Sequence, residues 1–222
     1  MSNYSVPRIA VVNYSTLTTA AAVRQFVPAL QTQVRRDFAP IWGIDAVVVS
    51  VTQSGILPFH WVLGVFDSAD QAGALGYHEL TPAGKPVMKV FVKDSADAGV
   101  PLSSVASHEL LEALGDAFVE SLALKDTGKA TGILYPVEVC DPVETDLYPI
   151  YGVQVSNFVT PYWFGDPLPV GGKYDFLGKL NAPFTMTPGG YVSTRAITKA
   201  GLQPWQEAFA DARGKQLSKL FQ

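Results

Sequence analysis

The segment SHELLEALGD, residues 107–116, places four side chains that can bind a metal or transfer a proton inside an otherwise apolar stretch. They are His108, Glu109, Glu112 and Asp116. The chain has only 3 histidines, so one beside two glutamates is a notable concentration. On a helix, residues four apart project from the same face, so His108 and Glu112 can hold one cation between them. The segment therefore predicts a helix that carries a metal site.

The composition indicates a folded protein and excludes several functional classes. Hydrophobic residues make up 48% of the 222 residues and charged residues 16%, which argues against disorder. A net charge of -4 offers no electrostatic attraction to nucleic acid or to an anionic membrane. The chain has no apolar run of about 18 residues, the length that would be needed to span a bilayer. We expect neither nucleic acid nor membrane as a partner.

The compartment is predicted from two weaker observations. The first residues lack the basic region, the long apolar region and the cleavage site of a signal peptide. The single cysteine, Cys140, excludes an internal disulfide and fits a reducing compartment. We expect a cytoplasmic protein, or one released without a signal peptide.

Outward from residues 107–116, the pattern predicts an α+β fold with a mixed, twisted sheet. Continuous apolar runs indicate buried strands, and apolar residues at helical spacing indicate helices. Residues 67–86 are loop-like. The expected elements are strands at 8–14, 43–51, 59–66 and 87–93, and helices at 16–42 and 102–118.

The second half has a different composition. Many prolines, glycines and aromatic residues lie between residues 126 and 194, with short β-like pieces such as 151–164. Residues 203–221 have the pattern of an amphipathic helix. We predict a single domain over 1–222, with an upper α/β part at about 1–118 and a loop-rich lower part at about 119–222.

The order β-α-β-β-β-α, ending in a helix with His-Glu-x-x-[metal ligand], resembles the upper subdomain of zincin metallopeptidases. The motif differs from the family's His-Glu-x-x-His because Glu112 replaces the second histidine. The resemblance implies a metal-dependent hydrolase that acts on a peptide or protein. It makes Glu109 the general base, which takes a proton from water and returns it to the leaving amine. It also implies that strand 87–93 is the sheet edge that aligns the substrate.

Two further residues resemble the metzincin branch of that family. Gly115 stands where the pattern His-Glu-x-x-His-x-x-Gly has its turn glycine, and Met186 lies in a turn similar to the methionine turn. The position of the third metzincin ligand is Phe118, which cannot bind a metal. Another side chain must complete the site.

Carboxylates can supply this third ligand. Asp116 could fold back toward the ion if the helix stops at Leu114, whereas a longer helix would carry it too far away. The segment YPVEVCDPVE, residues 135–144, offers Glu138 and Asp141 as well as Glu144. A glutamate from later in the chain would complete the site in the way that the gluzincin branch of the zincin family does. The pair SHELLEALGD and EVCD is also similar to uncharacterised bacterial sequences with Ser-His-Glu-Leu-x-Glu-Ala-x-x-Asp followed by Glu-Ile-x-Asp, which favours both segments meeting at one site.

The ligand set constrains the metal. One histidine with two or three carboxylates suits a divalent cation, with zinc expected first and manganese, iron or calcium as alternatives. A more negative ligand set makes the cation a weaker Lewis acid. The sequence therefore supports metal binding better than it supports fast proteolysis.

Two rival hypotheses stay open. The first is a non-catalytic structural or interaction protein, such as a virion or assembly component, that retains a zincin scaffold with or without a cation. The second is a hydrolase of a non-peptide substrate. The remaining candidate side chains favour structural roles. His60 is expected to be a packed strand residue. His78 is expected in the loop before strand 87–93, where it could also border a cleft. Cys140 is expected to be a buried inert thiol, with a soft metal ligand as the alternative.

Overall fold

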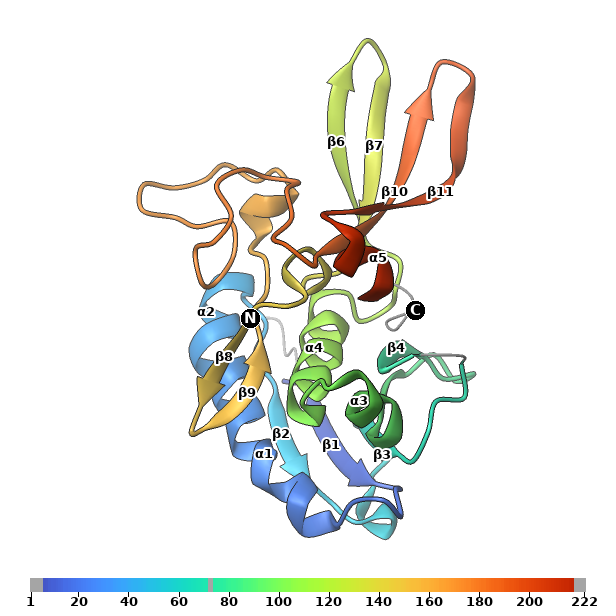
Figure 1. The fold of residues 1–222 in the computed structure, drawn as a ribbon, viewed down its shortest axis with the longest axis vertical. Coiled ribbons are helices and arrows are strands. Elements are labelled where there is room, and N and C mark those ends of the chain that lie inside the picture. Colours follow the sequence, from blue (N-terminus) through green and yellow to red (C-terminus); the bar gives the residue numbers. More distant parts are fainter. Residues whose placement is uncertain (1–5, 72–73, 218–222) are drawn as a thin grey trace.

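A five-stranded mixed sheet forms the centre of the upper α/β part predicted at about 1–118, which is drawn at the bottom of Figure 1. The computed structural model describes residues 6–71 and 74–217. The strand order is β2-β1-β3-β5-β4; β4 is antiparallel to β5 and the other pairs are parallel. The strands are β1 (Arg8–Asn13), β2 (Val47–Ser50), β3 (His60–Phe66), β4 (Gly76–Leu80) and β5 (Pro86–Phe91).

The structure corrects the predicted edge of this sheet. The strand predicted at 87–93 is β5, which pairs with β3 on one side and β4 on the other. It ends at Phe91 because Val92 begins a short helix, α3 (Val92–Ala98). The edge is β4, which lies in the segment predicted to be a loop. An extended substrate could therefore pair with β4 but not with β5.

The predicted long helix is present as three consecutive pieces. α1 (Ala20–Thr32) begins after Thr19, whose side chain accepts a hydrogen bond from the backbone of Ala22. The helix widens to a π-helix at Gln33–Phe38 and ends with α2 (Ala39–Trp42). Gly43 terminates it with a φ of 72°, a left-handed conformation that glycine adopts without strain.

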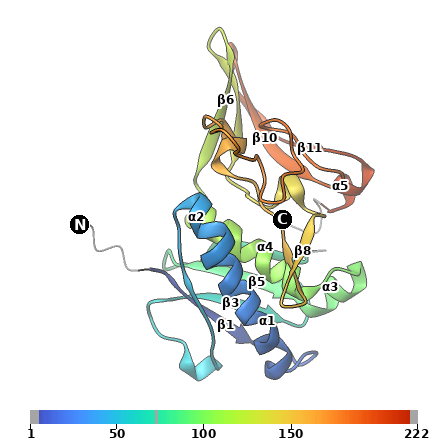
Figure 2. The same ribbon diagram turned by 90° about the vertical axis from the view of Figure 1, so that its left-hand side faces the viewer.

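The helix expected at 102–118 is α4 (Leu102–Gly115). It contacts β4, β5 and the strand β9 (Val153–Ser156), so it lies between the sheet and the lower part of the chain (Figures 1 and 2). All of its residues from Ser104 to Leu114 are buried. A helix that is buried on every side needs a reason for its polar residues, because an unpaired buried charge is costly.

The lower part contains more strand than the sequence predicted. β6 (Leu122–Gly128), β7 (Thr131–Pro136), β10 (Tyr191–Thr198) and β11 (Gly201–Phe209) form an antiparallel sheet in the order β11-β10-β7-β6. Its two hairpins project away from the upper sheet (Figure 1). A small hairpin, β8 (Leu147–Ile150) and β9 (Val153–Ser156), lies beside α1 and α4. Single 3-10 turns occur at Gln53–Gly55, Asp141–Val143 and Pro161–Phe164.

The helix predicted at 203–221 is wrong over residues 203–211 and present at 212–217. Residues up to Phe209 belong to β11, and a helix, α5 (Ala212–Leu217), follows. Residues 218–221 lie outside the described residues. Pro204 fits β11 because this strand is at the sheet edge, where a missing backbone N–H costs little.

The described chain thus has the mixed sheet and the helix around His108 that the sequence predicted, and the structure adds that this helix is buried. One hydrophobic cluster joins Leu63 of the upper sheet, Leu110 of α4 and Trp163 and Val192 of the lower part. No helix within 6–71 and 74–217 is long and apolar enough to cross a membrane.

Candidate metal centre

His108 lies in the buried part of α4 and contacts three carboxylates. Its Nε2 is 3.1 Å from Glu112 Oε1, one helical turn along α4, and 3.3 Å from Asp141 Oδ1. Its Nδ1 is 3.0 Å from Glu144 Oε2. The predicted pairing of His108 with Glu112 is therefore present, and so is the contact between α4 and the segment 135–144.

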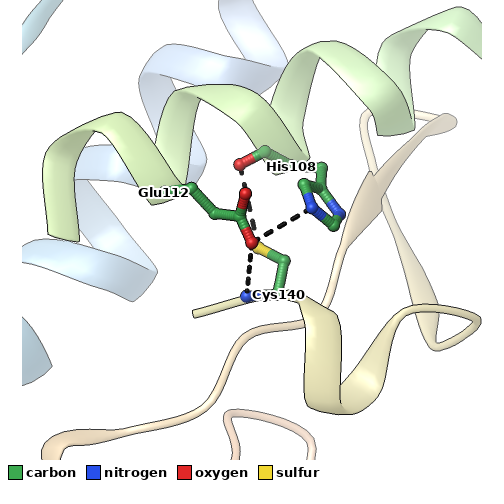
Figure 3. A group of neighbouring side chains, drawn as sticks. All are labelled: His108, Glu112 and Cys140. Atoms are coloured by element: carbon green, nitrogen blue, oxygen red, sulfur yellow. Dashed lines mark hydrogen bonds and ion pairs between the residues drawn. The ribbon is translucent and has the colours of Figure 1, made fainter. Parts of the chain in front are cut away.

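Two further contacts hold that segment against α4. The backbone N–H of Cys140 donates to Glu112 Oε1 over 3.3 Å, and the Cys140 Sγ lies 3.8 Å from the carbonyl oxygen of His108 (Figure 3). Burial raises the pKa of the Cys140 thiol well above its usual value, which favours the protonated form. Cys140 is fully buried, as the sequence suggested.

A buried hydrogen-bond network fixes α4 one residue before His108. The Ser107 hydroxyl donates to Gln33 Oε1 over 2.7 Å and accepts from the backbone N–H of Ser156 over 2.9 Å. Gln33 Nε2 donates to the carbonyl of Ser156 over 2.8 Å. The π-helix, α4 and β9 are thereby tied together beside the carboxylate cluster.

His78 belongs to the same cluster, although the sequence pattern placed it only in a loop that could border a cleft. It lies on the edge strand β4, and its Nδ1 is 3.6 Å from both Glu109 Oε2 and Glu112 Oε2. Its Nε2 is 3.9 Å from Glu138 Oε2. Only 8% of its side chain is exposed. The prediction that His78 lies in a loop is wrong because residues 76–80 pair with β5.

The 3-10 turn at Asp141–Val143 brings Asp141 and Glu144 to the same histidine. An extended segment would instead have turned Asp141 away from Glu138 and Glu144. Pro142 suits the start of such a turn because its fixed φ is close to the helical value. The proline after Asp141 was the sequence signal that could have revealed Glu144 as a neighbour.

The chain after Met186 packs against this 3-10 turn and hydrogen-bonds to it. The backbone N–H of Thr187 donates to the carbonyl of Pro142 over 3.0 Å. A side chain at Gly190 would overlap that same carbonyl oxygen, so only glycine fits. Next to it, the Tyr191 hydroxyl hydrogen-bonds to Asp141. Met186 itself precedes the hydrogen-bonded turn, which runs from Thr187 to Gly190, and packs against the core.

The cluster holds more acidic than basic side chains. Burial tends to lower the pKa of His78, but the interaction with Glu109 and the charges of Glu138 and Glu112 outweigh it and raise the pKa to about 10. Burial raises the pKa of Glu138, and likewise that of Glu144, to about 7, although the nearby histidine charges oppose it. Without a cation, Glu138 and Glu144 therefore retain their protons to a higher pH than exposed glutamates do.

A cavity of about 250 Å³ opens beside the cluster. It lies between β4 and α4 on one side and strands β7, β10 and β11 on the other. Side chains of Glu109, Tyr191 and Glu207 line it together with His78, Glu112, Glu138 and Asp141. The cluster can therefore be reached by a small group or by part of a larger substrate.

Three groups of side chains bring possible ligand atoms within 4.8 Å of one another. Each contains one histidine. The groups are His108 with Glu112 and Cys140, His78 with Glu112 and Glu138, and His108 with Asp141 and Glu144. Histidine nitrogen and carboxylate oxygen are ligands that zinc, manganese and iron accept.

Asp116 lies outside this cluster. It follows the end of α4, where Oδ2 accepts a hydrogen bond from the backbone N–H of Ser121 over 2.8 Å and Oδ1 accepts from the hydroxyl of Ser121 over 2.9 Å. These contacts hold the turn that connects α4 to β6, and none of the three groups of possible ligands includes Asp116.

An Asp116→Ala variant tests this structural role. We expect it to lower the free energy of unfolding by about 1 kcal/mol, because the backbone N–H and the hydroxyl of the exposed Ser121 lose their common acceptor. Its metal content should equal that of the parent when both are measured by plasma mass spectrometry. Loss of metal from a folded Asp116→Ala protein would contradict the assignment.

The chain matches no protein-family model, no curated protein and no solved structure in the comparisons. The functional interpretation therefore rests on the geometry of the cluster itself.

Proposed function

We propose that the protein is a metal-dependent hydrolase of the zincin-like type, with a peptide or protein as its substrate. The observation that carries the proposal is the carboxylate cluster around His108 and His78, buried in the molecule but open to a cavity. Buried carboxylates in excess of buried cations are costly unless a cation accompanies them. A divalent cation would supply that charge.

His108, Glu112 and Asp141 are the ligands that we assign to this cation. Both carboxylates contact the same atom, His108 Nε2. Glu112 Oε1 lies 3.1 Å from it and Asp141 Oδ1 lies 3.3 Å from it. A cation that displaces the proton from Nε2 would find both carboxylates beside it. When bound, it would polarise a substrate carbonyl and ease the ionisation of water. Zinc is the first expectation, with manganese, iron and calcium as alternatives.

Glu109 is the proposed general base. It follows His108 on α4, lines the cavity and is 2% exposed. It would take a proton from the attacking water and deliver it to the leaving group. Tyr191 lines the cavity beside Asp141.

The experiment that tests the proposal measures metal and hydrolysis in the same preparations. Tag-free protein is analysed for bound metals and incubated with a peptide library, beside a His108→Ala/Glu112→Ala double variant. We expect near-stoichiometric metal and cleavage products for the parent, and neither for the folded double variant. A parent that binds no metal after incubation with each ion would end the hydrolase proposal.

The position of the Glu109 carboxylate gives a separate prediction. A side chain at Gly76 on β4 would come within 2.7 Å of Glu109 Oε1 and 2.9 Å of Val105 Cγ1. We expect Gly76→Ala to shift Glu109 and to lower the hydrolysis rate about tenfold to a hundredfold, because misplacing a catalytic group by about 1 Å can cost that much. The bound metal should remain.

A Gly55→Ala variant is the matched control, since its new side chain would meet neighbours at ordinary contact distances of 3.4 Å or more. It should leave the hydrolysis rate unchanged. A Gly76→Ala protein as active as the control would show that Glu109 has freedom to move and does not act from its present position.

One observation favours the non-catalytic alternative. The projecting hairpins carry exposed apolar side chains, among them Leu124 at 54% and Trp205 at 45% exposure. Such side chains on an extended sheet are typical of a surface that contacts another protein. Under this alternative the protein is a structural or assembly component. Replacing the proposed general base, Glu109, by Gln would then have no functional effect.

A further inference from the structure

We propose that the cluster holds two divalent cations that share Glu112, the second of them bound by His78 and Glu138. This inference rests on the proposed function only in assuming the first cation at His108. It adds a ligand, His78, whose sequence context gave no sign of metal binding.

The two oxygens of Glu112 face different histidines. Oε1 lies 3.1 Å from His108 Nε2, and Oε2 lies 3.6 Å from the nearer nitrogen of the His78 ring, Nδ1; one nitrogen of His78, one oxygen of Glu112 and one oxygen of Glu138 lie within 4.8 Å of one another. Glu112 also belongs both to a group of possible ligands with His108 and to one with His78, and each group has its own histidine. A carboxylate in this position can give one oxygen to each of two ions. Paired ions in hydrolytic enzymes lie about 3.5–4 Å apart, a separation that one bridging carboxylate can span.

Two buried atoms on the His78 side have no hydrogen-bond partner among the described residues, namely His78 Nε2 and Glu138 Oε2. They face each other at 3.9 Å. Buried polar atoms in native proteins are nearly always satisfied, so this pair calls for a further ligand between them. Two metal–ligand bonds of about 2.1 Å span such a separation at an open angle.

The other nitrogen of His78 has the surroundings that a metal-bound imidazole requires. Nδ1 lies 3.6 Å from Glu109 Oε2. A histidine that binds a metal through one nitrogen usually presents its other N–H to a carboxylate, which fixes the tautomer and the ring orientation. With Glu109 beside Nδ1, the lone pair of Nε2 is left for the cation.

The charge of the cluster also suits two cations. His78 and His108 are the positive partners of Glu109, Glu112, Glu138, Asp141 and Glu144 in the ion pairs of this region. One divalent cation at His108 leaves only the single positive charge of His78 among Glu109, Glu112 and Glu138. A second divalent cation balances them, and its chemistry would be that of zinc, manganese or iron.

The first test counts ions per chain. Tag-free protein is saturated with Zn²⁺, freed of excess by gel filtration and analysed by plasma mass spectrometry. We expect two ions for the parent, one for His78→Asn and two for His60→Asn. His60 is a matched control because it is also buried, yet its Nδ1 accepts from the backbone N–H of Leu57 outside the cluster. Circular dichroism verifies that each variant is folded.

The count separates the second ion from the first. One ion in the parent, retained in His78→Asn, would overturn the two-cation proposal and leave the proposed hydrolase intact. No ion in the parent would overturn both.

A second measurement needs no variant and covers the case in which His78→Asn fails to fold. The parent is loaded with two equivalents of Mn²⁺ and examined by electron paramagnetic resonance. Two ions that share Glu112 should give a broad, exchange-coupled signal in place of the six-line signal of isolated Mn²⁺. Two bound ions with isolated signals would place the second ion elsewhere and overturn the proposal.

Discussion

Replacing Glu109 by Gln should reduce hydrolysis about a hundredfold to ten-thousandfold, the contribution that a positioned general base typically makes. Glutamine has nearly the shape of glutamate but cannot accept a proton at this step. Because Glu109 is not among the ligands that we assign to the first cation, the folded variant should retain that ion. The measurement is the rate of peptide cleavage beside the metal content of the same sample.

The control for this prediction is Glu79→Gln. Glu79 is a glutamate of the same edge strand as His78, but it is 44% exposed and pairs with Lys89. It should keep both the parent's rate and the parent's metal. A Glu109→Gln protein that cleaves at the parent's rate would remove Glu109 from the mechanism. One that loses the first cation would make Glu109 a ligand.

The sequence predicted the local elements that their own residues determine. The apolar run at 8–14 and the helical spacing around His108 correspond to β1 and α4. Local periodicity is reliable there because the same residues that form the element also face the core. The side chains on that helix, His108, Glu109 and Glu112, were identified for the same reason.

Long-range pairing was the feature that local patterns could not provide. The segment Gly76–Leu80 becomes a strand only because it pairs with β5, and this pairing brings His78 to the cluster. A short strand flanked by loop-like residues has little signal of its own. The proximity of His78 to the cluster was therefore missed together with the strand.

The same limitation explains the error near the end of the chain. Residues 203–209 have apolar side chains at spacings that a helix could use, yet they pair with β10 across a tight turn at Gly201. The positive φ of 107° at Gly201 favours that turn. Strand pairing with a neighbour overrides a modest helical preference.

Removing the cations should destabilise the protein, and the loss should grow as the pH rises from 5 to 8. With a cation at a thousand times its dissociation constant, binding to the folded state alone contributes about 4 kcal/mol. The ligands must lose their protons before they bind, so this contribution increases with pH. The measurement is denaturant unfolding at several pH values, with excess metal and with a chelator.

The metal-free protein should become less stable over the same pH range. The folded-state pKa of Glu138, and likewise of Glu144, is raised to about 7 from 4.5, so between these values the folded protein holds more protons than the unfolded chain. Each such group lowers the free energy of unfolding by roughly 1.4 kcal/mol per pH unit. The raised pKa of His78 has the same sign, because its stabilising contribution is complete below about 6.5 and is lost as the pH rises toward about 10.

A Glu138→Gln/Glu144→Gln variant serves as the control for the metal-free curve. Without these carboxyls, its stability in chelator should change much less between pH 5 and 8 than that of the parent. A parent whose metal-free stability is flat or rises over this range would show that the carboxyls ionise freely in the folded state. The cluster would then have no deficit of positive charge for a cation to supply, and the electrostatic basis of the metal centre would fail with it.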